Sequence, residues 1–435
     1  MPVLVFGSDP YAMARAASGK ASRRGALCRT GYEAEIEIRY RLATQQSGRN
    51  KRNHLIRMTN ISVSHTVSSI ENPASGPTYS VTGLARAQSE LGATVKLCSL
   101  GDPFASNATS YEDQRFPHAM LALPLVNRLG VSGPMRQALS RSSSEIIHTH
   151  GLWMLPNIYR SKRSTFVVSP RGMLSSVALS YSPNKKRLFR FLFQDRALSD
   201  AALLHATADS EYDDIRRFGL RQPVAVIPNG IDIPKIDRSA DIVSRREVLS
   251  LGRIHKKKGL VSLISAWAGV CDEFPDWKLR IVGPDEGGHV RELEEVIKNL
   301  GLTSVSIEQP VFGDDKIRLM SSVDLFVLPT LSENFAMTVA ESLSVGVPVI
   351  STKGAPWEGL QVHRCGWWVD HGSASLSASL RSALALTDFE RRAMGERGRK
   401  WMSRDFSWER IAQMSVDAYL WLLGRGDRPD FVYEA

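Results

Sequence analysis

The sequence predicts an α/β protein of two domains, each built on a doubly wound and mainly parallel sheet. Its 435 residues are too many for one ordinary domain. From residue 58 onward, short β-rich runs alternate with longer helical patterns, and this alternation pauses at a turn-rich stretch, 228–234. Hydrophobic residues make up 43% and charged residues 23% of the chain, which excludes a disordered or fibrous protein.

Two series of elements follow from the pattern. The first series has expected strands at 61–67, 94–98, 145–148, 166–169, 203–206 and 224–227, with a helix at 80–91. The second has expected strands at 248–251, 279–282, 325–328 and 347–350, with helices at 335–345 and 408–423. We therefore expect two Rossmann-like domains that face each other across a cleft, because ligands of such sheets bind at the carboxyl ends of the strands. The expected boundaries are 1–57 for an extension, 58–234 and 235–405 for the domains, and 406–425 for a terminal helix that can return to the first domain.

The positive charge is concentrated at the N-terminus. The formal net charge is +10, and residues 1–57 hold eleven Lys or Arg against four Asp or Glu, a net +7. The near-neutral remainder argues against a nucleic-acid-binding protein. We interpret 1–57 as an extension upstream of a natural start at Met58; the alternative is a basic tail that binds anionic lipid.

The cysteines indicate a reducing compartment. Cys28, Cys98, Cys271 and Cys365 form no C-x-x-C pair, which leaves zinc and redox motifs without support. Scattered cysteines in a chain of this size are typical of buried thiols, and no run of about 18 apolar residues predicts a spanning helix. We therefore expect a cytoplasmic protein.

The segment 323–350 carries the most informative motif. A buried strand is followed by a short loop with Glu333, then by a helix with Glu341. Asn334 is the expected N-cap of this helix. The two residues are eight positions apart, which corresponds to about 12 Å if both were helical, and two carboxylates at that separation suit two hydroxyl-bearing groups of one elongated ligand. The backbone N–H groups that open the helix suit a phosphate.

A second motif follows the strand at 248–251. Here Arg253 and Lys258 lie in a cationic loop with a glycine near each end. Arginine binds a diphosphate through two parallel hydrogen bonds, and lysine adds a compact charge. The chain has no D-x-D pair in this context, so the sequence does not call for a metal or another cofactor.

With these two motifs, the segments 226–232 and 75–77 complete a resemblance to the retaining glycosyltransferases of the GT-B fold, in the large group called family 4. The match covers roughly 58–425. Three further segments, 148–153, 169–174 and 354–358, are similar to members that build bacterial exopolysaccharide or lipopolysaccharide. The resemblance implies acceptor binding by the first domain and nucleotide-sugar binding by the second.

The resemblance also implies roles for individual residues. Glu333 faces the donor sugar and, with His150, is the expected catalytic pair. The residues expected to bind the donor are Gly76, Arg253, Lys258, Glu333, Phe335, Ala336, Met337, Thr338 and Glu341. Ala336 departs from the glycine that the family often has here, and its methyl group bears on which donor sugar fits. Without a Cβ, Gly76 allows close approach of the donor phosphate.

The acceptor side is expected to include Arg171, Lys185 and Lys186. The segment 185–193 mixes cations with large apolar residues, which suits either a solvated helix with one core face or a helix that docks on a membrane. The implied partners are a UDP- or GDP-sugar, a glycan or lipid-linked acceptor and the inner membrane surface, but no nucleic acid. The alternatives that remain open are a sugar-nucleotide epimerase or phosphorylase of the same fold, or a basic nucleic-acid-binding protein.

Overall fold

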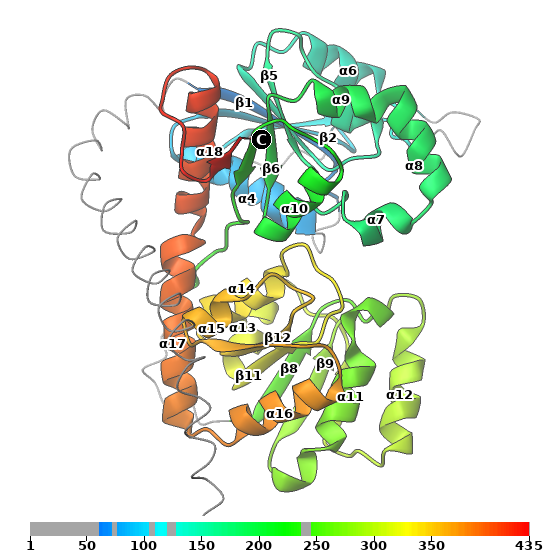
Figure 1. Ribbon diagram of the computed structural model, residues 1–435, viewed down its shortest axis with the longest axis vertical. Helices are drawn as coiled ribbons and strands as arrows, with labels where there is room; N and C mark the ends of the chain where they lie inside the picture. The colour runs from blue at the N-terminus through cyan, green and yellow to red at the C-terminus, as the bar shows by residue number, and fades with distance from the viewer. Residues whose placement is uncertain (1–60, 72–75, 104–108, 120–127, 236–244, 435) are drawn as a thin grey trace, which may run out of the picture. The chain divides into compact units, whose positions relative to one another are not determined.

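The computed structural model describes residues 61–71, 76–103, 109–119, 128–235 and 245–434. The expected extension 1–57 and the start at Met58 lie outside the described residues. Residues Asn60–Ala435 form one compact unit. The predicted fold class is confirmed, because the unit contains two sheets with helices packed against them (Figure 1).

The first sheet has eight strands in the order β14-β7-β6-β5-β4-β1-β2-β3. All pairs are parallel except β14 with β7. The strands are β1 (Ser62–Ser69), β2 (Thr94–Leu100), β3 (Glu112–Phe116), β4 (Ile146–His150), β5 (Thr165–Ser169), β6 (Leu203–Ala206), β7 (Val224–Val226) and β14 (Val432–Tyr433). The helices between them are α4 (Gly76–Glu90), α6 (Gly133–Ser140), η1 (Leu155–Ile158), α7 (Ser176–Ser180), α8 (Pro183–Phe189), η2 (Arg190–Gln194), α9 (Asp195–Ser199) and α10 (Asp209–Arg217).

The second sheet has six parallel strands in the order β10-β9-β8-β11-β12-β13. They are β8 (Glu247–Leu251), β9 (Lys278–Val282), β10 (Val305–Glu308), β11 (Leu325–Leu328), β12 (Val349–Thr352) and β13 (Gly366–Val369). The helices of this half are η3 (Lys256–Lys258), α11 (Leu260–Ala268), η4 (Cys271–Glu273), α12 (His289–Asn299), α13 (Gly313–Ser322), α14 (Met337–Ser344), α15 (Gly359–Val362), α16 (Ser373–Leu384) and α17 (Asp388–Asp405).

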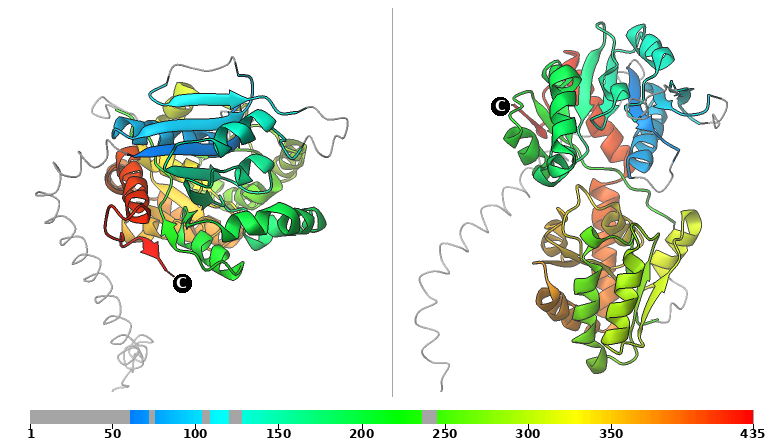
Figure 2. Two further views of the ribbon diagram at one scale, coloured as in Figure 1. Left: turned by 90° about the horizontal axis from the view of Figure 1, so that it is seen from above. Right: turned by 90° about the vertical axis from the view of Figure 1, so that its right-hand side faces the viewer.

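Both faces of the second sheet are covered, as Figures 1 and 2 show. Leu249, Phe326 and Val349 belong to one apolar cluster, while their chain neighbours Val248 and Leu325 belong to another. Alternate residues of a strand point to opposite faces, so each face carries its own core. This explains why these strands appear in the sequence as continuous apolar runs.

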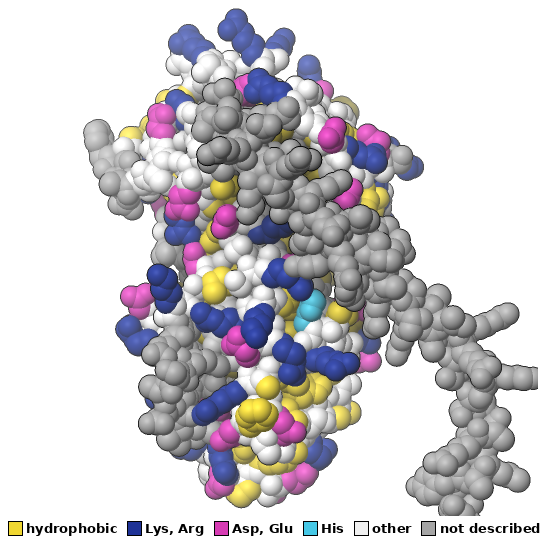
Figure 3. All heavy atoms as spheres, turned by 90° about the vertical axis from the view of Figure 1, so that its left-hand side faces the viewer, with side chains coloured by type: hydrophobic (Ala, Val, Ile, Leu, Met, Phe, Trp, Pro, Cys, Tyr) yellow, Lys and Arg dark blue, Asp and Glu magenta, His cyan; other side chains and the backbone are white. Residues whose placement is uncertain are grey.

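The terminal helix α18 (Trp408–Leu422) packs against α4 of the first half. The contact is close, since a Cβ atom on Gly83 would lie 2.2 Å from the Trp408 ring. A Cβ atom on Gly230 would also lie 2.2 Å from that ring. Figure 3 shows the face near α17, where Lys and Arg side chains lie among Asp and Glu side chains. On this face the exposed charge is therefore of both signs.

Candidate functional site

The loops that follow β8 and β11 are in direct contact. Gly259 has φ +66°, and a Cβ atom there would lie 2.1 Å from the carbonyl oxygen of Pro329, so the approach requires glycine. The backbone N–H of Leu331 donates to the carbonyl of Lys257 at 2.8 Å. This packing brings the ammonium group of Lys258 onto the carboxylate of Glu333. Two residues predicted from separate motifs thus form an ion pair.

Arg253 lies on the same loop but at its exposed rim. Its guanidinium pairs with Glu286 at 2.8 Å, and the two side chains are 65% and 46% exposed. Such an exposed pair contributes about 1 kcal/mol or less, so a bound anion can replace Glu286 at low cost. Without a ligand, Arg253 and Lys258 therefore have different acidic partners.

Glu341 lies on α14 and pairs with Lys316 of α13 at 2.6 Å. Sequence reasoning missed Lys316, because α13 shows no motif and the pair forms only when two helices meet. Tyr79, in the first turns of α4 after Gly76, packs against the cluster that contains Ala336. Burial raises the pKa of Tyr79 above its usual range, and Asp232, which accepts its hydrogen bond at 2.9 Å, adds to this shift. Tyr79 at the start of α4 thus packs on the same apolar cluster as residues of α14.

The first turn of α14 differs from the prediction. The helix begins at Met337, so Phe335 and Ala336 precede it. Asn334 is not the N-cap, because its side-chain amide instead donates to the Thr207 hydroxyl at 2.7 Å. Ala336 occupies the cap position with φ +63° and provides no side-chain hydrogen bond. This left-handed backbone is unfavourable for a residue with a Cβ, which gives a physical reason why glycine suits the position.

His150 and Arg171 are brought together, although they were predicted to meet different substrates. His150 is 2% exposed at the end of β4, and its Nδ1 accepts a hydrogen bond from Arg171 at 2.9 Å. Its Nε2 bonds His65 at 2.9 Å. Burial lowers the pKa of His150 well below its usual value, and His148 and Arg171 lower it further. Both ring nitrogens of His150 are therefore occupied within the protein.

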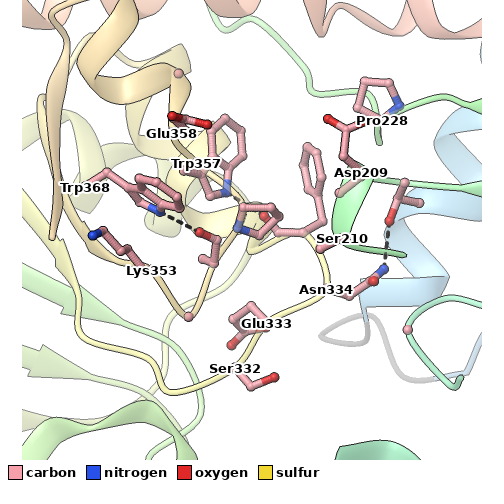
Figure 4. Close-up of a pocket in the computed structure, with 18 of the residues that line it drawn as sticks. Asp209, Ser210, Pro228, Ser332, Glu333, Asn334, Lys353, Trp357, Glu358 and Trp368 are labelled. Atoms are coloured by element: carbon pink, nitrogen blue, oxygen red, sulfur yellow. Dashed lines mark hydrogen bonds between the residues drawn. The ribbon is translucent and has the colours of Figure 1, made fainter. Parts of the chain in front are cut away.

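A pocket of about 850 Å³ adjoins the Glu333 loop (Figure 4). Of the predicted site residues, only Glu333 and Phe335 line it; the cationic loop does not. Its walls carry carboxylates and indole rings, including Asp209, Glu358, Trp357 and Trp368. We take the Lys258–Glu333 contact as the chemical centre, because it joins a cation and a carboxylate from two of the predicted motifs.

Lys185 and Lys186 lie on α8, next to large exposed apolar side chains. Lys186 stands over the Trp153 ring at 5.7 Å, and its ammonium group donates to the carbonyl of Ala178. Leu188, Phe191 and Leu192 are 61%, 84% and 52% exposed. Within the described residues, no helix is both long and apolar enough to span a membrane.

Two family models match the chain. "Glycosyl transferase 4-like domain" matches residues 75–230, and "Glycosyl transferases group 1" matches residues 232–401. The D-inositol 3-phosphate glycosyltransferase of Corynebacterium urealyticum is 24% identical over 64% of this chain and 71% of its own length. The GDP-mannose:cellobiosyl-diphosphopolyprenol alpha-mannosyltransferase of Xanthomonas oryzae pv. oryzae is 25% identical over 69% of this chain and 81% of its own. Among solved structures, the sucrose-phosphate synthase from Thermosynechococcus elongatus has a similar fold, with a TM-score of 0.67 and 19% identity over 84% of this chain and all of its own.

Proposed function

Because the chain belongs to the group 1 glycosyltransferases, and is thus a nucleotide-sugar-dependent enzyme, we propose that it is a retaining hexosyltransferase that acts on a glycan or lipid-linked acceptor. The family membership confirms the resemblance seen in the sequence. Both family models describe glycosyltransferases, which favours transfer over the epimerase, phosphorylase and nucleic-acid-binding alternatives. We infer a UDP- or GDP-sugar as donor.

The contact between Lys258 and Glu333 carries this proposal. Lys258 has a cationic end suited to a diphosphate, and Glu333 has a carboxylate suited to sugar hydroxyls. A sugar diphosphate carries its diphosphate on the anomeric carbon and hydroxyl groups on the neighbouring ring carbons, so it offers both kinds of partner close together. In the free protein each side chain neutralises the other, and a donor takes over both partners at once.

The mechanism follows from the charge that develops when the anomeric C–O bond breaks. The sugar gains oxocarbenium character, and the diphosphate leaves with negative charge. Lys258, Arg253 and the N-terminal end of α14 stabilise that charge. The acceptor hydroxyl forms the new bond to the anomeric carbon, and its proton passes to the leaving phosphate on the same face. This route retains the configuration and leaves no proton transfer for His150 to perform.

The remaining donor contacts extend from this centre. Glu341 holds the ribose hydroxyls of the nucleotide, and the Phe335–Thr338 backbone, with Ala336, Met337 and Thr338, binds phosphate and sugar oxygens. Gly76 faces the donor phosphate from the start of α4; among the described residues, no atom outside its chain neighbours and its own helix backbone lies within 4 Å of where its Cβ would be. Because Ala336 lies among these donor contacts, its methyl group is proposed to influence which donor sugar fits.

A lipid-linked acceptor for exopolysaccharide or lipopolysaccharide synthesis is supported by the name of the Xanthomonas relative, which refers to a diphosphopolyprenol. The surface of α8 and η2 suits the same acceptor. We define the docking patch as the cations Lys185, Arg187 and Arg190 with the apolar side chains of Leu188, Phe191 and Leu192. Apolar side chains flanked by cations bind the interface of anionic lipid. We propose that the protein works at the inner membrane face by this patch.

Donor use is tested with purified protein in a thermal-shift panel of UDP-, GDP- and ADP-sugars, followed by transfer assays on lipid-linked acceptors. A ligand that binds only the folded state raises the melting temperature, so a UDP- or GDP-sugar is expected to do so. If no nucleotide sugar raises it and no transfer occurs, the proposed donor site is wrong.

Membrane docking is tested by co-sedimentation with vesicles that contain about 30% phosphatidylglycerol. We expect Phe191→Ser to lower the bound fraction severalfold. Phe389→Ser is the matched control, because Phe389 lies on α17 and is 81% exposed, outside the docking patch. Equal losses in both variants, or no loss in either, would contradict docking through this surface.

A further inference from the structure

Four buried histidines lie together next to the loop of Arg171. His65, His148, His150 and His205 are between 0% and 3% exposed. Neighbouring ring centroids are 4.1 to 5.4 Å apart. Both nitrogens of each ring have a hydrogen-bond partner. A neutral imidazole has one donor and one acceptor nitrogen, so the direction of every bond follows once one end of the chain is fixed.

The first end is Arg171, which can only donate. Its NH2 group lies 2.9 Å from Nδ1 of His150, so that nitrogen is an acceptor and the hydrogen is on Nε2. Nε2 of His150 then donates to Nδ1 of His65 at 2.9 Å. Nε2 of His65 in turn donates to Oε1 of Gln88 at 2.7 Å.

The second end is the carbonyl oxygen of Ile227, which can only accept. Nε2 of His205 donates to it at 2.8 Å, which leaves Nδ1 to accept from the Ser169 hydroxyl at 2.8 Å. The Ser169 oxygen accepts from Nε2 of His148 at 2.7 Å. Nδ1 of His148 therefore accepts from the Tyr419 hydroxyl at 2.6 Å.

The two halves meet at Gln88. Its amide oxygen accepts from His65, and its amide nitrogen donates to the Tyr419 oxygen at 3.5 Å, the longest bond of the chain. The amide orientation that satisfies one half also satisfies the other. Adding a proton to His65 or His150 would point two N–H groups at each other. Adding one to His148 or His205 would point an N–H group at a hydroxyl that already donates to that ring. In agreement, burial lowers the pKa of His65 to about 4 and that of His205 to about 3.

Arg171 connects this chain to the Glu333 loop. Arg171 has φ +57°, and the next residue, Gly172, donates from its backbone to the Glu211 carboxylate at 2.5 Å. A Cβ atom on Gly172 would lie 3.0 Å from the side chain of Asn334, the neighbour of Glu333. Among the described residues, Nε of Arg171 has no hydrogen-bond partner. The guanidinium is held at two points, because NH1 donates to Oδ1 of Asn229 at 2.6 Å and NH2 donates to His150 at 2.9 Å, and its buried Nε is a donor without a partner in the described part of the chain.

We propose that His65, His148, His150 and His205 form one uncharged, one-directional hydrogen-bond chain that positions the guanidinium of Arg171, whose chain neighbour Gly172 contacts the Glu333 loop. They are then positioning residues, and neither proton carriers nor metal ligands. All four rings carry their hydrogen on Nε2, and the cation at the end of the chain is Arg171. The part that concerns Arg171 rests on the proposed transfer to a glycan or lipid-linked acceptor, because we take this cation to bind a phosphate group of that acceptor. The tautomers and the neutrality of the rings do not depend on it.

The tautomers are read directly by NMR on the full chain with ¹⁵N-labelled histidine, and single His→Gln variants assign the four signals. We expect four Nε2–H tautomers that do not titrate between about pH 5.5 and about pH 8. A ring with its hydrogen on Nδ1, or a ring that becomes charged in this range, would overturn the proposal. This result stands whether or not the protein transfers sugar.

The positioning role is tested with Tyr419→Phe, which removes the hydroxyl between Gln88 and His148. Tyr159→Phe is the control, because it also removes a buried hydroxyl that accepts a hydrogen bond, here from the Ser132 backbone, but outside the chain. We expect Tyr419→Phe to change the His148 signal and to raise KM for the acceptor at least about fivefold, with KM for the donor unchanged. Equal effects of the two variants on KM would overturn the positioning role.

A metal site is the competing explanation, since ligand atoms of His65, His148 and His150 lie within 4.8 Å of one another. Zinc alone is added to the purified protein, and the same histidine signals are followed. We expect no shift, because each nitrogen already has a protein partner. Binding of one zinc per chain that shifts the three signals would overturn the proposal.

Discussion

The ammonium group of Lys258 contacts the carboxylate of Glu333 across 75 positions of sequence. Their side chains are only 18% and 23% exposed, so neither charge is fully hydrated. Each therefore depends on the other in the free protein. A ligand that offers an anion to Lys258 and hydroxyls to Glu333 can separate them without leaving either charge unpaired.

This relationship predicts different effects for the two partners. Lys258→Ala removes a charge-assisted contact of about 1.5–3 kcal/mol and is expected to weaken binding of UDP or GDP about 10- to 100-fold. Glu333→Gln frees Lys258 from its pair, so nucleotide affinity stays equal or rises, while kcat for transfer falls at least about 100-fold. Calorimetry and initial rates measure the two quantities. Parallel losses of nucleotide affinity in both variants would contradict this division of roles.

The parts of the site that the sequence reveals are those on one continuous segment. Glu333 and Glu341 could be predicted because a buried strand, a loop and a helix follow one another within 323–350. The partner Lys316 could not, because its position depends on how α13 packs on α14. The same holds for Tyr419, which reaches the histidines only because α18 docks on α4.

Among the strands, too, some could be predicted from the sequence and others could not. β3 was not predicted, because its five residues are polar or only partly buried and show no apolar alternation. The central strands were predicted because burial on both faces makes them apolar throughout. The N-cap prediction for Asn334 was wrong because a long-range partner, Thr207, competes for its side chain.

The left-handed backbone of Ala336 predicts a stabilising substitution. A residue with a Cβ loses about 1 kcal/mol or more in this conformation, and Ala336→Gly removes that cost. Part of the gain is offset by the greater entropy of glycine in the unfolded chain. We expect an unchanged or slightly higher melting temperature. Ala340→Gly within α14 is the control and should lower stability by about 1 kcal/mol. If both variants lose stability equally, the backbone at 336 is not strained.

The contact between α4 and α18 predicts a strong effect from one methyl group. Gly83→Ala places its Cβ against the Trp408 ring, and overpacking of this kind costs about 1–3 kcal/mol. Gly133→Ala is the matched control, because Gly133 also lies in a helix, but its Cβ position has no atom within 4 Å from the described part of the chain beyond its neighbours and its own helix backbone. Urea unfolding should show a loss for Gly83→Ala and none for Gly133→Ala. A neutral Gly83→Ala would mean that α18 does not pack on α4 this closely.

The buried histidines predict a stability that falls in mild acid. In the folded protein the pKa of His65 is about 4 and that of His205 about 3, below the 6.5 of an exposed ring. The unfolded chain therefore takes up protons below about pH 6.5 that the folded protein cannot bind, so the stability is complete above that pH and is lost as pH falls through it. Between about pH 6.5 and about pH 4, each such histidine lowers the free energy of unfolding by up to about 1.4 kcal/mol per pH unit as the pH falls. Urea midpoints at about pH 7.5, 6.5 and 5.5 should decline steeply, and the exposed His371→Gln variant should decline in parallel. A midpoint that stays constant down to about pH 5 would show that the four rings accept protons in the folded state.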